Sequence, residues 1–268
     1  MVINFAKRVT TALFLALVVW SCKDSGTGAE PDSPPVIPDI TVAQPDFSYF
    51  ESPAMMADQT MMEGEAYATA QGTVMGAGFM FAFGQLGTAY FEMARDQESE
   101  FKNGQWVWSY SAAYDGESME VRLVATVDED ANEVQWAYYI SSSGGDVEYN
   151  ELKLMGGTTS LDGKTGDWAM YGFDDSAGQQ AVMAYDWSVD SDENLKASFE
   201  FPSDDANTSL IYMQDGSRYT LTINNINGTV EVYWDVENDQ GYWWDKTENE
   251  KLCWSSGKAN IACGDIGL

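Results

Sequence analysis

The sequence predicts a mainly β protein, in which an antiparallel β-meander of ten to twelve strands, curved or barrel-like, packs on one apolar N-terminal helix. Three observations support this fold class. From residue 105 onward, apolar and polar residues alternate with a period of two, which is typical of strands with one buried and one wet face. Short turn sequences separate the alternating runs. Residues 72–91 form a long uncharged stretch that the strands are expected to cover.

The first 21 residues have the composition of a secretory signal. Lys7 and Arg8 precede an apolar run over residues 9–19, which is too short to span a membrane. The sequence Val19-Trp20-Ser21-Cys22 resembles the lipobox of bacterial lipoproteins, in which the cysteine becomes the acylated N-terminus. The resemblance implies a signal peptide over residues 1–21 and a membrane anchor at Cys22. It covers only this segment.

The segment after the cysteine is rich in proline. Five of the seven prolines lie in residues 22–46, so we expect a flexible tether there and a single β-meander domain over residues 47–268. Lys23-Asp24 resembles the start of the tag that some exported outer-membrane lipoproteins carry. This resemblance implies an outer-membrane location, with the cell surface favoured over the periplasmic face.

The apolar helix is expected over about residues 66–97. No charged residue lies between Glu65 and Glu92, and apolar side chains fall on every side of a helix with 3.6 residues per turn. Such a helix has no solvent face, so it must be enclosed by the protein or enter a bilayer. Two interpretations remain open: the helix completes the core, or it lines a cavity that carries an apolar ligand. In the second case the lining residues are Phe79, Phe83, Leu86 and Tyr90.

The strands are predicted from their alternation, which is clear around residues 106–110, 119–127, 134–140, 152–154, 183–189, 195–201, 219–223, 230–234 and 252–254. Dipeptides that adopt the positive φ of tight turns fall between these runs. They are Asp115-Gly116, Gly144-Gly145, Asp162-Gly163, Asp215-Gly216 and Asn227-Gly228. A meander of this length is expected to curl, because closure removes exposed strand edges.

The charge balance excludes one class of partner. The chain has 13 Lys and Arg against 43 Asp and Glu, for a net charge of -30. Binding to nucleic acid requires clustered basic residues, so we expect no nucleic-acid partner.

The residue types present restrict the possible chemistry. The chain has no histidine, which excludes Ser-His-Asp and Cys-His nucleophiles and the usual zinc ligands. Cys253 and Cys263 are expected to form a structural disulfide, because their spacing is not that of a redox pair. Hydrolysis by two carboxylates stays possible, but no pair stands out among 43 acids. We therefore expect a protein that is not an enzyme and has no catalytic residue or cofactor.

Two acidic segments place oxygen ligands at alternate positions, as calcium-binding loops do. They lack the central glycine and distal glutamate of an EF-hand, and hairpin turns explain them equally well. The calcium candidates are Asp128, Asp130 and Asn132 in one segment and Asp190, Asp192 and Asn194 in the other.

The last candidate site is aromatic. Tyr242, Trp243 and Trp244 are consecutive, so in a strand they point to alternate faces and one large ring must face outward. An exposed ring beside acidic groups can stack on a sugar. The sequence thus favours a non-catalytic binding or structural lipoprotein, with an apolar-ligand carrier and a carbohydrate-binding or carbohydrate-active protein as alternatives.

Overall fold

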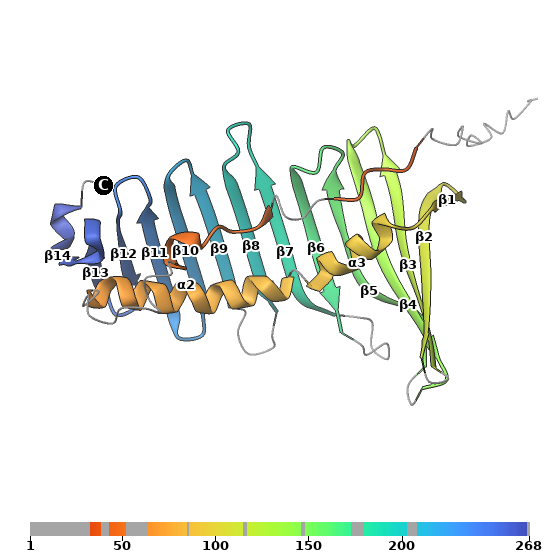
Figure 1. Cartoon of the computed structure of the whole chain (residues 1–268), viewed down its shortest axis with the longest axis horizontal. Helices are drawn as coiled ribbons and strands as arrows, with labels where there is room; N and C mark the ends of the chain where they lie inside the picture. The colour runs from red at the N-terminus through yellow and green to blue at the C-terminus, as the bar shows by residue number, and fades with distance from the viewer. Residues whose placement is uncertain are drawn as a thin grey trace, which may run out of the picture. The chain divides into compact units, whose positions relative to one another are not determined.

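The strands pair in chain order, each with the next, to make one antiparallel sheet (Figure 1). The structure is a computed structural model, and it describes residues 33–38, 43–51, 64–84, 86–114, 117–145, 148–172, 180–202 and 208–266. Mainly β architecture is therefore confirmed.

The described part contains fourteen strands, two α-helices and three short 3-10 helices. The helices are η2 (Ser48–Phe50), α2 (Glu65–Gly84), α3 (Leu86–Arg95), η3 (Ser256–Lys258) and η4 (Cys263–Asp265). The first seven strands are β1 (Ser99–Lys102), β2 (Gln105–Tyr114), β3 (Glu117–Asp128), β4 (Glu133–Ser143), β5 (Tyr149–Ser160), β6 (Thr165–Tyr171) and β7 (Ala181–Val189). The others are β8 (Leu195–Phe201), β9 (Thr208–Asp215), β10 (Arg218–Asn225), β11 (Gly228–Asp235), β12 (Gln240–Asp245), β13 (Glu250–Trp254) and β14 (Asn260–Ile261).

Two details of the predicted sheet are not confirmed. The sheet has fourteen strands instead of ten to twelve, and it is open, with β1 at one edge and β14 at the other. β6 and β9 were missed because they carry apolar or aromatic residues on both faces, which hides the period of two. The edges are protected without closure: β14 has only two residues, and β1 carries charged Glu100 and Lys102.

The turn sequences mark hairpins as expected. Gly144, Gly163 and Gly216 have positive φ and lie in the connections after β4, β5 and β9, and Gly228, also with positive φ, is the first residue of β11. Asp115-Gly116 lies outside the described residues. Asn103, Asp239 and Asn249 also adopt positive φ, in connections that the dipeptide pattern did not single out. Local turn chemistry therefore specifies much of the meander.

The expected single helix over residues 66–97 consists of two, α2 and α3, both lying across one face of the sheet (Figure 1). We call this face the inner face. α2 contacts β11, β12, β13 and β14, and α3 contacts β2. The expectation that the helix has no solvent face is wrong, because Met75 and Phe79 of α2 are exposed. No helix in the described ranges combines the length and apolarity needed to cross a membrane.

The inner face consists of rows of large side chains that run across the strands. Strand register aligns Trp187, Ala197, Tyr212, Leu221, Val232, Trp243 and Leu252 in one such row. Gly241 lies between Trp234 and Trp254 in another row, and a Cβ at this glycine would come within 2.3 Å of the Trp254 ring. The glycine thus leaves room for the indole beside it. α2 and the N-terminal segment lie along these rows and remove them from water (Figure 1).

The N-terminal covering segment, residues 43–51, packs directly on the inner face. Phe50 is 1% exposed and its ring centroid lies 5.2 Å from that of Trp234 and 5.4 Å from that of Tyr67 in α2. The Asp46 backbone N–H donates to the Tyr212 hydroxyl at 3.1 Å. This segment therefore joins the helix to the sheet. Residues 43–46, which their composition assigns to the tether, belong to it.

Residues 33–38 of the expected tether also contact the domain. Ile37 is buried, and Arg95 at the end of α3 donates to the Pro38 carbonyl at 2.7 Å.

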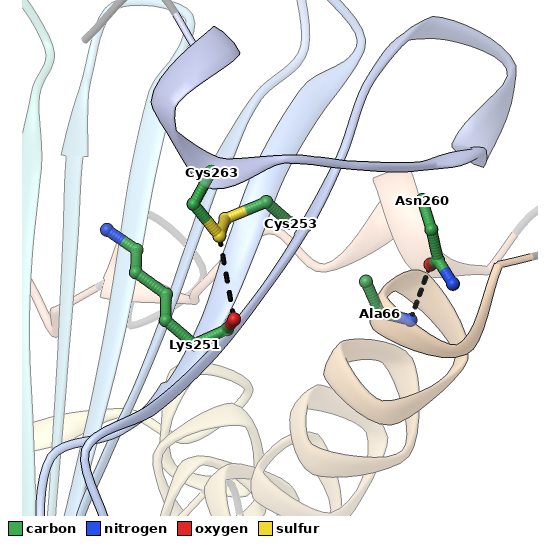
Figure 2. The surroundings of a disulfide bond; sticks show 5 residues. All are labelled: Ala66, Lys251, Cys253, Asn260 and Cys263. Carbon is green, nitrogen blue, oxygen red and sulfur yellow. Dashed lines mark hydrogen bonds between the residues drawn. A yellow bond between two sulfur atoms is a disulfide. The ribbon is translucent and has the colours of Figure 1, made fainter.

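The start of α2 is fixed by the other end of the chain (Figure 2). The Asn260 side chain in β14 accepts a hydrogen bond from the Ala66 N–H at 3.0 Å, which satisfies one free donor of the first helical turn. Gly64 precedes the helix, and a Cβ there would lie 2.3 Å from the Asn260 oxygen, so a side chain would displace this cap. The predicted disulfide between Cys253 and Cys263 is present, with Cα atoms 5.2 Å apart. It holds the chain on both sides of Asn260.

We predict that Phe50→Ala destabilises the protein by about 3 to 5 kcal/mol, because the substitution empties a fully enclosed aromatic site. The control is Val36→Ala, which removes an apolar side chain that is 86% exposed and should change stability by less than about 0.5 kcal/mol. Urea unfolding followed by tryptophan fluorescence measures both. Equal stabilities for the two variants would mean that the covering segment is not part of the core.

We also predict that stability falls as the pH rises above about 10. Burial raises the pKa of Tyr49, Tyr185 and Tyr212. Above pH 10 the unfolded chain releases these protons while the folded protein keeps them, so the free energy of unfolding decreases with pH. In thermal melts between pH 8 and pH 12, the melting temperature should decrease only above about pH 10.

The matched variant for the alkaline prediction is Tyr185→Phe. It removes the hydrogen bond to the Ala43 carbonyl, which costs about 1 kcal/mol near neutral pH. It also removes one titrating group, so its loss of stability above pH 10 should be shallower than in the wild type. An identical slope in both proteins would contradict the assignment to buried tyrosines.

Candidate functional site

The face of the sheet opposite the helices, the outer face, carries a cluster of aromatic and charged side chains near the C-terminal end. Strand register places Glu231 of β11 beside Trp244 of β12, and Trp244 beside Lys251 of β13. Two residues further along the same face, Tyr233 of β11 lies opposite Tyr242 of β12. With Lys246, which follows β12, these residues define the aromatic-lysine cluster: Glu231, Tyr233, Tyr242, Trp244, Lys246 and Lys251.

Two rings of the cluster stack on each other, and lysine ammonium groups lie against ring faces. Tyr233 and Tyr242 stack with centroids 5.3 Å apart and planes inclined by 19°. The Lys251 ammonium lies 3.6 Å from the Tyr242 centroid and 5.3 Å from that of Trp244, at cation-π distance from both. Lys246 lies 5.1 Å from the Trp244 centroid. The two lysines therefore border the aromatic surface.

Glu231 binds two other members of the cluster. Its Oε1 accepts a hydrogen bond from the Tyr242 hydroxyl at 2.7 Å, and its Oε2 pairs with the Lys246 ammonium at 2.6 Å. Burial and the hydrogen bond to Glu231 raise the pKa of Tyr242, so this hydroxyl stays a donor at neutral pH.

Lys251 differs from the other lysine of the cluster. Burial lowers its pKa, with the attraction of Glu231 acting in the opposite direction. No carboxylate of the described residues lies within ion-pair distance of its ammonium. Its described contacts are with the ring faces of Tyr242 and Trp244.

The arrangement combines flat apolar rings with donors and acceptors at their borders. Sugars present the same combination, an apolar ring face edged by hydroxyl groups, so the cluster is suited to stack on a saccharide. Cross-strand aromatic and charged pairs also stabilise a sheet by about 0.2 to 1 kcal/mol each, so the cluster has a structural effect even without a ligand.

The three predicted stacking residues do not share a face. Trp243 lies on the inner face, where its indole N–H donates to the Thr73 hydroxyl of α2 at 3.2 Å. Tyr242 and Trp244 lie on the outer face with the cluster. The expectation that one large ring faces outward is confirmed for Trp244. Sequence analysis missed Glu231, Tyr233, Lys246 and Lys251. The alternation of β11 and β13 could have placed Glu231, Tyr233 and Lys251 on the face opposite the buried residues, whereas Lys246 lies in the turn after β12.

The predicted ligand-lining residues are placed only in part. Phe79 is 68% exposed, so its side chain does not line an interior cavity. The side chains of Phe83, Leu86 and Tyr90 lie outside the described residues. Where the contacts are described, rings fill the space between α2 and the sheet: Phe81 packs against Phe47 and Phe199 at centroid distances of 5.9 and 5.8 Å.

A groove of about 590 Å³ lies at the other end of the sheet. It is open to solvent and lined by Pro34, Pro35, Val36, Ile37, Arg95, Gln97, Glu98, Ser99 and Trp108. Its position does not match the predicted cavity beside residues 79–90, and it offers no enclosed space for an apolar ligand.

The first calcium candidate segment is a hairpin turn between β3 and β4. The Asp128 carboxylate accepts a hydrogen bond from the Ala131 N–H at 3.0 Å, and Asn132 adopts a positive φ of 59°. Asp130 lies between them, at an exposed position. The carboxylate of Asp128 therefore stabilises the turn.

The second segment is a turn of the same kind between β7 and β8. Asp190 accepts hydrogen bonds from the backbone N–H groups of Asp192 and Asn194 at 2.8 and 3.0 Å, and from the Asn194 side chain. The hydrogen bonds from Asn194 lower the pKa of Asp190. Within the described ranges, no three His, Cys, Asp or Glu side chains form a group suited to a metal ion. Calcium binding stays a prediction.

Of the other predicted residues, Cys253 lies on β13 opposite Tyr242, so the disulfide borders the aromatic-lysine cluster. Cys22 and the signal sequence lie outside the described residues.

Comparisons with known proteins gave no match to this chain, whether with protein-family models, curated proteins or solved structures.

Proposed function

We propose that the protein is a non-catalytic saccharide-binding lipoprotein, anchored through Cys22 in the outer membrane and exposed at the cell surface. The observation that supports the binding role most is the aromatic-lysine cluster. Its Trp244 and Tyr242 rings face away from the helices, and Lys251 borders both rings without a carboxylate partner among the described residues. The lipid anchor is inferred from the sequence Val19-Trp20-Ser21-Cys22.

In this proposal Trp244 supplies the stacking surface and Lys251 the hydrogen-bond donor. The Tyr233 and Tyr242 pair extends the ring surface across two strands, so more than one sugar unit can be held. A binding role without catalysis fits the carboxylates of this region, which have structural partners. Glu231 binds Tyr242 and Lys246, and Asp235 accepts hydrogen bonds from Ser217 and Asn238.

We predict that Trp244→Ala weakens saccharide binding at least tenfold, which corresponds to about 1.4 kcal/mol of stacking. Calorimetric titration of the mature protein with a panel of neutral and acidic oligosaccharides identifies the ligand and measures the change. Binding to an acidic sugar should also weaken in Lys251→Gln.

Two control variants keep this test specific. Trp243→Phe replaces the neighbouring ring on the inner face and loses the bond to Thr73, so it should bind as the wild type does. The second control, Tyr139→Ala, removes a ring of β4 that is on the outer face but outside the cluster, and it should also bind as the wild type does. No binding to any sugar of the panel, or equal affinities for Trp244→Ala and Trp243→Phe, would refute the proposed site.

We further predict that Cys22→Ala yields an unprocessed precursor that takes up no fatty acid. Metabolic labelling with an alkyne fatty acid should mark the wild type and leave this variant unmarked. A control substitution at the neighbouring Ser21, Ser21→Ala, keeps a small residue before the cysteine and should be labelled normally. Mature-sized protein released from cells by Cys22→Ala would contradict lipidation at this residue.

A further inference from the structure

α2 presents an uncharged apolar face to the outside of the protein. The residues directed toward the sheet are buried, among them Ala70, Val74 and Phe81. On the opposite side Phe79 is 68% exposed and Met75 is 49% exposed. The other exposed residues on this side, after Glu65 at the start of the helix, are Ala68, Gly72, Gly76 and Ala82. With Phe79 they follow one another at intervals of three or four positions, so they lie along one line of the helix. We call these six residues the outward face of α2.

The glycines of this face do not serve contact with the sheet. A Cβ at Gly72 or Gly76 would meet no atom within 4 Å, so both lie on open surface. Alanine would favour the helix by about 1 kcal/mol at each position. The packing of the described residues therefore does not explain why glycine stands at these two positions.

The absence of charge is unusual for this protein. Of all residues, 21% are charged, and the net charge is -30. Residues 66–91 nevertheless contain no Asp, Glu, Lys or Arg. A helix face with exposed Phe and Met in an otherwise acidic surface marks a region that is suited to contact another apolar surface.

The length of the chain before the described residues indicates which surface that is. Between Cys22 and Ser33 lie ten residues, which span at most about 35 Å when extended. A lipid at Cys22 therefore keeps the sheet and its helices close to a bilayer. A second copy of the chain is less suited to this face, because two proteins of charge -30 repel each other.

We propose that the outward face of α2 lies on the lipid surface of the membrane in which Cys22 is anchored. The inference rests on the proposed anchor. The opposite side of α2 packs on β11, β12, β13 and β14, so the helix contacts lipid along its length, with Phe79 and Met75 entering the interface. The outer face of the sheet, with the aromatic-lysine cluster, then points away from the membrane and toward soluble ligand.

The test uses nitroxide spin labels on lipidated full-length protein in vesicles of phosphatidylcholine and phosphatidylethanolamine. Single thiols are introduced as Phe79→Cys and Met75→Cys. The matched control is Met213→Cys, a residue of β9 on the outer face with 44% exposure. Cys253 and Cys263 are joined and do not react. Power saturation then compares collisions with oxygen, which concentrates in lipid, and with a water-soluble nickel chelate.

We expect the ratio of oxygen to nickel collisions to be several-fold higher at positions 75 and 79 than at position 213. Equal ratios at all three positions in protein that floats with the vesicles would refute lipid contact and leave the anchor intact. Dipolar broadening between labels at position 79, without a raised oxygen ratio, would assign the face to a second copy and also refute the inference. Protein that fails to float would refute the anchor itself, and the inference with it.

Discussion

The burial of the aromatic inner face is the constraint on which the structure depends. A fourteen-stranded open sheet has no interior of its own, so its apolar face must be covered by other parts of the chain. α2 and the N-terminal covering segment provide the cover by lying across the strands, along rows of large side chains. Phe50 illustrates the arrangement, because its ring contacts Trp234 and Trp254 of the sheet and Tyr67 of the helix. Sheet, helix and covering segment therefore share one core.

This arrangement gives the sheet two different faces. The inner face is closed by rings that pack against each other, whereas the outer face of the C-terminal strands keeps Tyr242 and Trp244 beside polar groups. The disulfide lies near the C-terminal end of the chain. It connects Cys253 of β13, next to the aromatic-lysine cluster, with Cys263. Asn260, which lies between the two cysteines in the sequence, caps α2. The C-terminal end of the sheet and the start of α2 are thus in direct contact.

Much of the meander could be predicted from the sequence, because alternation and turn residues act locally. In β8, Ala197 and Phe199 are buried while Lys196 and Glu200 are exposed, as their order predicts. β9 could not be found in this way, since the run from Leu210 to Met213 is apolar on both faces.

Features set by distant contacts could not be predicted. The Asn260 cap joins residues 194 positions apart, and the exposure of Phe79 depends on which side of α2 meets the sheet. The candidate site was predictable to the extent that one large ring of the consecutive aromatics had to face outward. Its partners Glu231 and Lys251 come from neighbouring strands, so they required the register of β11, β12 and β13.

The most direct test of the shared core is native-state hydrogen exchange, resolved by residue. If α2 is part of the same cooperative unit as the sheet, the amides at the centre of Glu65–Gly84 exchange only through global unfolding, with the free energy measured for the amides of Gly228–Asp235. The free energies of exchange for the two sets of amides should be equal, and both should decrease by the same amount in Phe50→Ala. Exchange of the α2 amides at a much lower free energy, while the strands stay protected, would contradict the shared core.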